Sequence, residues 1–99
     1  MIYVIRISDT ELKIGYTTDF EYRRFALKDK YGVFDVIGIA KGNRKKEQSI
    51  HRQLRDYRSR SPDREVYRIS QEVVWVVQSL LRPIQEQDVI GLMMDQYLE

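Results

Sequence analysis

Hydrophobic positions near the N-terminus follow the two-residue period of β-strands. Residues 2–7 (IYVIRI) are rich in β-branched side chains, and residues 11–17 (ELKIGYT) alternate between apolar and polar types. Both segments are therefore predicted to be strands. The polar stretch 8–10 between them is short, which favours an antiparallel hairpin.

The pattern then changes to that of a helix. Thr18 and Glu21 have the spacing of a capping box, so we expect a helix to begin near Asp19. Gly32 is a natural end for it. The next segment, 33–40, is apolar almost throughout, which is typical of a central strand buried on both faces.

Helices and strands continue to alternate in the rest of the chain. The further elements that we expect are a helix at 44–57, a strand at 65–69 and helices at 71–81 and 84–98. Trp75 stands among four valines, so we expect it in the core. The order of the elements predicts a small α/β fold that starts with an antiparallel hairpin.

Composition narrows the class of protein. Ninety-nine residues allow one domain. The chain has no cysteine and one histidine, which excludes disulfides, cysteine-type zinc sites and sites with several histidines. No apolar run approaches about 18 residues, so we expect no membrane span and a cytoplasmic protein.

Charge is distributed unevenly, although the net charge is only +2. Residues 41–64 hold nine lysines and arginines against three carboxylates, whereas residues 83–99 hold four carboxylates and no basic residue. A basic stretch is the footprint of nucleic-acid binding, but it is also common on solvated helices. The acidic tail must bury its apolar stripe either on its own domain or against a second copy in a homodimer.

Glu47 is the strongest candidate for chemistry. It lies on the apolar face of its predicted helix, with Ile50, His51 and Leu54 at the following helical positions. Burial of a carboxylate is costly unless it is paired with an arginine or binds a metal, and both alternatives stay open. His51 is either a hydrogen-bonded core residue or a second functional group.

Basic and phenolic side chains accompany Glu47. Tyr3 and Lys13 lie on the two hairpin strands, and a nearby ammonium lowers the pKa of a phenol. Arg23 and Arg24 follow on the first helix, where a guanidinium suits a phosphate. A packed aromatic ring, a solvated lysine and surface ion pairs are the simpler alternatives.

Several motifs together resemble a known nuclease family. Ile2-Tyr3-Val4 and Lys13-Ile14-Gly15 are followed by a helical Arg23, by the run 47–52 and by the run 65–70. This order is similar to that of the GIY-YIG nuclease superfamily, in the T5orf172/Mug113-like phage and bacterial branch whose second tripeptide reads KIG. Val66 and Arg64 depart from the GEWF motif of that branch. The resemblance implies a nuclease domain at 1–82 and leaves 83–99 as an amphipathic helical tail.

The resemblance also implies a fold and an activity. The fold is a small three-stranded antiparallel sheet flanked by helices, and the activity is that of an endonuclease dependent on Mg²⁺ or Mn²⁺. Its substrate is nucleic acid, expected to be double-stranded DNA. Tyr3 would act as the base, Arg23 would contact the phosphate and Glu47 would bind the metal.

Two sets of site residues follow. The catalytic candidates are Tyr3, Lys13, Arg23, Glu47 and His51. The candidates for substrate binding are Gly15, Tyr16, Arg24, Arg52 and Arg58. The alternative function is a non-catalytic module that binds nucleic acid or another partner and keeps the same fold.

Overall fold

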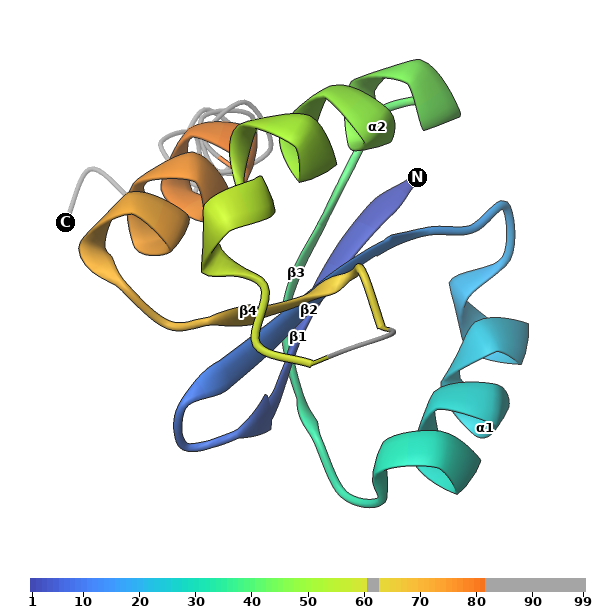
Figure 1. Ribbon diagram of the computed structural model, residues 1–99. Coiled ribbons are helices and arrows are strands. Elements are labelled where there is room, and N and C mark those ends of the chain that lie inside the picture. Colours follow the sequence, from blue (N-terminus) through green and yellow to red (C-terminus); the bar gives the residue numbers. More distant parts are fainter. Residues whose placement is uncertain (61–62, 82–99) are drawn as a thin grey trace, which may run out of the picture.

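The computed structural model describes residues 1–60 and 63–81, and it shows one antiparallel sheet with helices on both faces (Figure 1). The order of its four strands is β3-β1-β2-β4. The elements are β1 (Ile2–Ser8), β2 (Glu11–Tyr16), α1 (Phe20–Tyr31), β3 (Asp35–Ala40), α2 (Arg44–Gln53), the 3₁₀ helix η1 (Arg55–Tyr57) and β4 (Val66–Arg68), followed by a helix over 71–81.

The α/β class is confirmed, but the expected number of strands is wrong. The fourth strand is the short segment 66–68, which pairs with the outer edge of β2. The helix expected at 84–98 and the tail at 83–99 lie outside the described residues. No helix among the described residues is long and apolar enough to cross a membrane.

Local signals place α1 correctly, although its cap differs from the expected one. The side chain of Asp19, rather than that of Thr18, accepts the hydrogen bond from the Tyr22 backbone N–H at 3.1 Å. Gly32 ends the helix with φ of 77°, a left-handed value that glycine adopts without strain. The helix expected at 44–57 ends at Gln53, and its last turn is η1.

The two faces of the sheet bury separate clusters of side chains. One face packs against α2 and the 71–81 helix, and the other packs against α1 (Figure 1). Alternation along β1 explains the division, because successive side chains of a strand point to opposite faces. Ile2 and Val4 belong to the first cluster, and Tyr3 and Ile5 to the second.

Two expectations about the core are wrong. β3 is an edge strand rather than a central one, and its Val36 and Ile37 are 43% and 44% exposed. Trp75 is 69% exposed. The 71–81 helix turns Val73 and Val77 towards the sheet, and a residue two positions after Val73 lies about 200° further around the helix.

Candidate active site

An open cleft lies between the hairpin, α1 and the segment that precedes β4. Its volume is about 750 Å³. Its lining residues are Lys13, Arg23, Lys30, Tyr31, Arg60, Asp63, Arg64 and Glu65. The fold thus brings Lys13 of β2 and Arg23 of α1, two of the predicted site residues, to the same cleft.

Tyr3 is held against Gly15, its partner across the β1–β2 pair. A Cβ on Gly15 would collide with the ring and the hydroxyl of Tyr3, so only glycine fits there. On its other side the Tyr3 ring contacts Phe20 of α1, with 5.4 Å between the ring centroids. The absence of a side chain at Gly15 therefore leaves the space that the Tyr3 ring occupies.

The charges around Tyr3 differ from those that we expected. Burial raises the pKa of Tyr3 well above its usual value, and Glu65 raises it further. Arg23 lowers the pKa, while Glu47 raises it. The pKa of Tyr3 is therefore raised, against the expected lowering, because burial dominates. At neutral pH Tyr3 is a neutral phenol.

The partner of Lys13 is Glu65, which the sequence analysis did not single out. Lys13 is buried, and its Nζ donates to Glu65 Oε1 at 2.7 Å. The backbone N–H of Ile14 donates to the carbonyl of Glu65 at 3.0 Å, so the pairing of β2 with the chain before β4 sets the position of this carboxylate. The ammonium of Lys13 is therefore paired with Glu65.

Glu47, His51 and Glu65 form a group that could hold a metal ion. One ligand atom of each lies within 4.8 Å of the others. Glu47 is buried on α2 as its helical pattern predicts, and its carboxylate lies 3.5 Å from His51 Nε2. Nε2 is buried and has no hydrogen-bond partner among the described residues, so the donor set fits a metal.

Glu65 connects this group to the cleft, because it belongs to both.

Comparison with known protein families identifies the family of the chain. The T5orf172 domain family matches residues 1–82, which is most of the sequence. The chain belongs to the T5orf172 domain family. This family is associated with GIY-YIG-like, endonuclease-type domains. No curated protein and no solved structure matches the chain.

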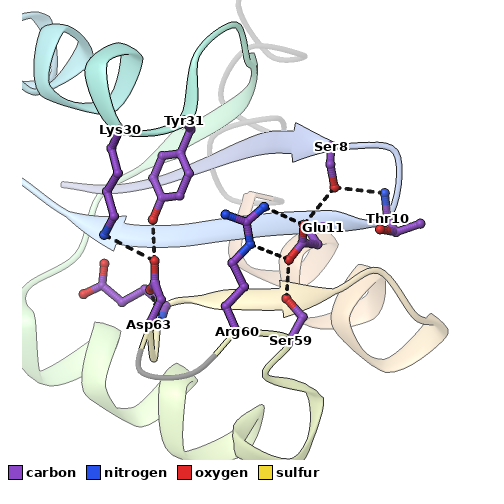
Figure 2. Close-up of polar contacts among 9 residues, drawn as sticks. Ser8, Thr10, Glu11, Lys30, Tyr31, Ser59, Arg60 and Asp63 are labelled. Carbon is purple, nitrogen blue, oxygen red and sulfur yellow. Dashed lines mark hydrogen bonds and ion pairs between the residues drawn. The ribbon is translucent and has the colours of Figure 1, made fainter.

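In this T5orf172 domain, side-chain contacts hold the segment before β4 from two sides (Figure 2). On one side, Arg60 donates two hydrogen bonds of 2.8 Å to the carboxylate of Glu11 on β2. On the other side, Asp63 accepts a hydrogen bond from Tyr31 and forms an ion pair of 3.4 Å with Lys30, both on α1. These contacts position Glu65, which follows Asp63 by two residues.

The Glu11 contact predicts a pH-dependent stability for the T5orf172 domain. Hydrogen bonds from Arg60 and Ser59 lower the pKa of Glu11 from 4.5 to about 2. Its stabilisation is therefore complete above pH 4.5 and is lost as the pH falls towards 2. We expect Glu11→Gln to lower the free energy of unfolding at pH 7 by about 1–2 kcal/mol, since solvent screens the half-exposed Arg60. Urea unfolding at several pH values measures this.

Glu21→Gln is the matched control, because Glu21 is exposed and its ion pair with Arg24 is long, at 3.7 Å. We expect little change in this variant at any pH. A Glu11→Gln protein as stable as the wild type at pH 7, or less stable by a constant amount down to pH 2, would contradict the prediction.

The remaining predicted residues of the T5orf172 domain are spread around the site. Arg24 is exposed, pairs with Glu21 and does not line the cleft. The Tyr16 ring lies under the Arg44 guanidinium at 5.0 Å, and Arg52 is exposed near the end of α2. The backbone of Arg58 forms an isolated antiparallel β-bridge with Tyr67. Burial raises the pKa of Tyr67 to about 12. The Nε of Arg58 is buried and has no hydrogen-bond partner among the described residues.

Proposed function

We propose that this T5orf172 domain is a metal-dependent endonuclease of the GIY-YIG type that hydrolyses phosphodiester bonds in nucleic acid. Double-stranded DNA is the proposed substrate. One observation carries the proposal: Glu65 joins a possible metal-binding group on α2 to a cleft that presents Lys13 and Arg23. Carboxylates that hold a divalent ion beside cations that receive a phosphate are what such a reaction needs.

Glu47 is the proposed principal metal ligand, with Mg²⁺ or Mn²⁺ as the ion for cleavage. A bound divalent ion neutralises charge on the phosphate and makes water a stronger nucleophile. Glu47 is buried, and no lysine or arginine pairs with it within the described part of the chain, so its charge is available to such an ion. Lys13 holds Glu65 in place through its 2.7 Å contact and lies at the same cleft.

Tyr3 and Arg23 act on the reacting groups in this proposal. As a neutral phenol, Tyr3 can both accept and donate a hydrogen bond, so it orients the attacking water. It takes the proton of that water as it passes its own proton to a neighbouring carboxylate, and Glu65 is the carboxylate whose charge acts most strongly on it. Arg23 lines the cleft, and its charge lowers the pKa of Tyr3. Its guanidinium meets the charge that develops on the phosphate oxygens.

Arg23 and its neighbour Arg24 provide a matched test. Removal of one charge-stabilising donor typically slows a reaction by about 10²–10³-fold. We expect Arg23→Ala to lower the single-turnover cleavage rate by about that factor, with a smaller effect on DNA binding. Arg24→Ala should stay within a few fold of the wild type, because Arg24 pairs with Glu21 outside the cleft. A larger loss in Arg24→Ala would contradict the assignment of the phosphate contact.

A homodimer formed through residues 83–99 stays a prediction, because that segment lies outside the described residues. Sedimentation measures the oligomeric state of the full chain and of a chain that ends at Pro83. Self-association of the full chain with a monomeric shorter chain would support the homodimer, whereas the alternative is that the tail packs on its own domain. A full chain that stays monomeric at high concentration would rule out the dimer.

A further inference from the structure

The imidazole of His51 has one partnered nitrogen and one free nitrogen. Nδ1 is in hydrogen-bond contact with the hydroxyl of Tyr67. Nε2 is buried, points to the carboxylate of Glu47 at 3.5 Å and has no hydrogen-bond partner in the described part of the chain. The two nitrogens therefore have different environments.

The contacts of the Tyr67 hydroxyl bear on which nitrogen carries the proton. The hydroxyl is within hydrogen-bond distance of the backbone carbonyl of Arg64, at 3.1 Å, and a carbonyl can only accept. When its one hydrogen points to Arg64, the hydroxyl accepts from His51, so this arrangement favours Nδ1 as the protonated nitrogen of the ring. In this tautomer Nε2 has a lone pair, which is the form of histidine that binds metals.

A lone pair on Nε2 creates an electrostatic conflict unless a cation lies beside it. A ring nitrogen of His51 and carboxylate oxygens of Glu47 and Glu65 lie within 4.8 Å of one another, and Nε2 is the nitrogen that faces Glu47. An unprotonated nitrogen and two carboxylates can only accept. The distance from Nε2 to Glu47 is too long for a good hydrogen bond even if the ring were doubly protonated. Lys13 Nζ donates to Glu65, but among the described residues no hydrogen bond joins Nε2 to Glu47. Acceptors that converge in this way have the arrangement of a metal-binding site.

We propose that His51 Nε2 binds the same divalent ion as Glu47 and Glu65, and that Tyr67 is a positioning residue that holds His51 in the required tautomer. This inference rests on the metal centre of the proposed function and specifies its ligands. A nitrogen ligand favours borderline ions such as Zn²⁺ and Co²⁺ over Mg²⁺, which prefers oxygen. Three protein ligands also leave coordination positions for water.

Tyr67 is well placed for this role. It is fully buried in β4, opposite Leu12 of β2, so the sheet fixes its backbone. Its ring stacks on that of His51, with centroids 5.6 Å apart and 16° between the planes. Packing and one hydroxyl together set the orientation of the imidazole.

The single histidine of the chain makes the tautomer directly measurable. Two-bond ¹H–¹⁵N correlation spectra of the full-length protein at neutral pH, without nucleic acid, report both ring nitrogens. We expect a protonated Nδ1 and an unprotonated Nε2. Addition of Zn²⁺, even in excess Mg²⁺, should shift the Nε2 signal to that of a metal-bound nitrogen. A protonated Nε2 before Zn²⁺ is added, or an Nε2 signal that Zn²⁺ leaves unchanged, would overturn the proposal.

A pair of tyrosine variants tests the positioning role. Loss of a group that orients a metal ligand typically weakens metal binding about 10–100-fold. We expect Tyr67→Phe to raise the Kd for Zn²⁺ by about that factor in calorimetry and to remove the preference for the Nδ1-protonated form. Tyr57→Phe is the control, since Tyr57 is partly buried against the same core, whereas the hydrogen bond and the ring stacking with His51 come from Tyr67. Unchanged Zn²⁺ affinity in a folded Tyr67→Phe protein would overturn the role of Tyr67.

The tautomer and the metal affinity can each be measured independently of folding of the variant or of cleavage. The tautomer is measured on the wild-type protein, so it does not depend on whether Tyr67→Phe folds. Metal binding without nucleic acid is also separate from cleavage. A domain that binds Zn²⁺ through His51 but does not cut would support the metal ligands and contradict the proposed function, whereas cleavage with an unshifted histidine would do the reverse.

Discussion

Replacement of Glu47 by glutamine is expected to abolish metal-dependent cleavage and to leave the fold intact. Glutamine keeps the shape of the side chain and removes its charge, so the proposed metal loses its principal ligand. A loss of several kcal/mol of transition-state stabilisation corresponds to about a thousandfold lower rate. Single-turnover cleavage of a labelled DNA duplex in Mg²⁺ or Mn²⁺ measures the effect.

Stability provides a second measurement on the same variant. Glu47 is buried, and among the described residues no lysine or arginine pairs with it; His51 Nε2 lies 3.5 Å away. Removal of a poorly paired buried charge stabilises a protein, so metal-free Glu47→Gln should melt at the same temperature as the wild type or higher. Glu21→Gln, on the exposed start of α1, is the control and should cut normally. Wild-type cleavage by Glu47→Gln would contradict the metal assignment.

The second large effect is expected for Tyr3→Phe. The ring that packs against Gly15 and Phe20 is preserved, and only the hydroxyl is lost. A positioned acid–base group typically contributes about 10²–10⁴-fold to a rate. We expect a loss of that size in single-turnover cleavage, with DNA affinity and melting temperature close to those of the wild type.

Tyr22→Phe is the control for this experiment, because Tyr22 lies on α1 and is 78% exposed. It removes the same atom from the same type of residue outside the cleft, so cleavage should not change. A Tyr3→Phe protein that cuts at the wild-type rate would show that the phenol takes no part in the reaction. Equal losses in both variants would point to a general effect on folding.

Part of this site could be predicted from the sequence because its signals are local. Glu47 interrupts the apolar face of a helix, and helical spacing alone places it towards the sheet. Tyr3 and Lys13 belong to a hairpin whose register follows from its short turn, and the observed pairs Tyr3–Gly15 and Ile5–Lys13 put both side chains on one face. These positions needed no information about distant parts of the chain.

Other parts depend on tertiary contacts that the sequence pattern does not reveal. Glu65 lies 52 residues after Lys13 and reaches it only because β4 pairs with β2. The apolar run at 33–40 predicts burial on both faces, but the strand order places β3 at an edge. Trp75 was misplaced because a run of valines has no helical period to show which side faces the sheet.

The pKa of Tyr3 shows the same limit for electrostatics. From the sequence, a lysine on the neighbouring strand is expected to lower it. In the structure, burial dominates, and Lys13 is engaged by Glu65. The net effect depends on how deeply the ring is buried and on which carboxylates lie nearby, and neither can be derived from spacing.

Cleavage by the wild-type protein is the most direct measurement of whether this T5orf172 domain is an enzyme. The full chain is incubated with labelled single- and double-stranded DNA and RNA in Mg²⁺, in Mn²⁺ and in EDTA, and binding is followed in parallel by gel shift. We predict shortened products from double-stranded DNA with either ion and none in EDTA. Nucleic acid that is bound but stays intact with both ions would contradict endonuclease activity and would make the domain a binding module.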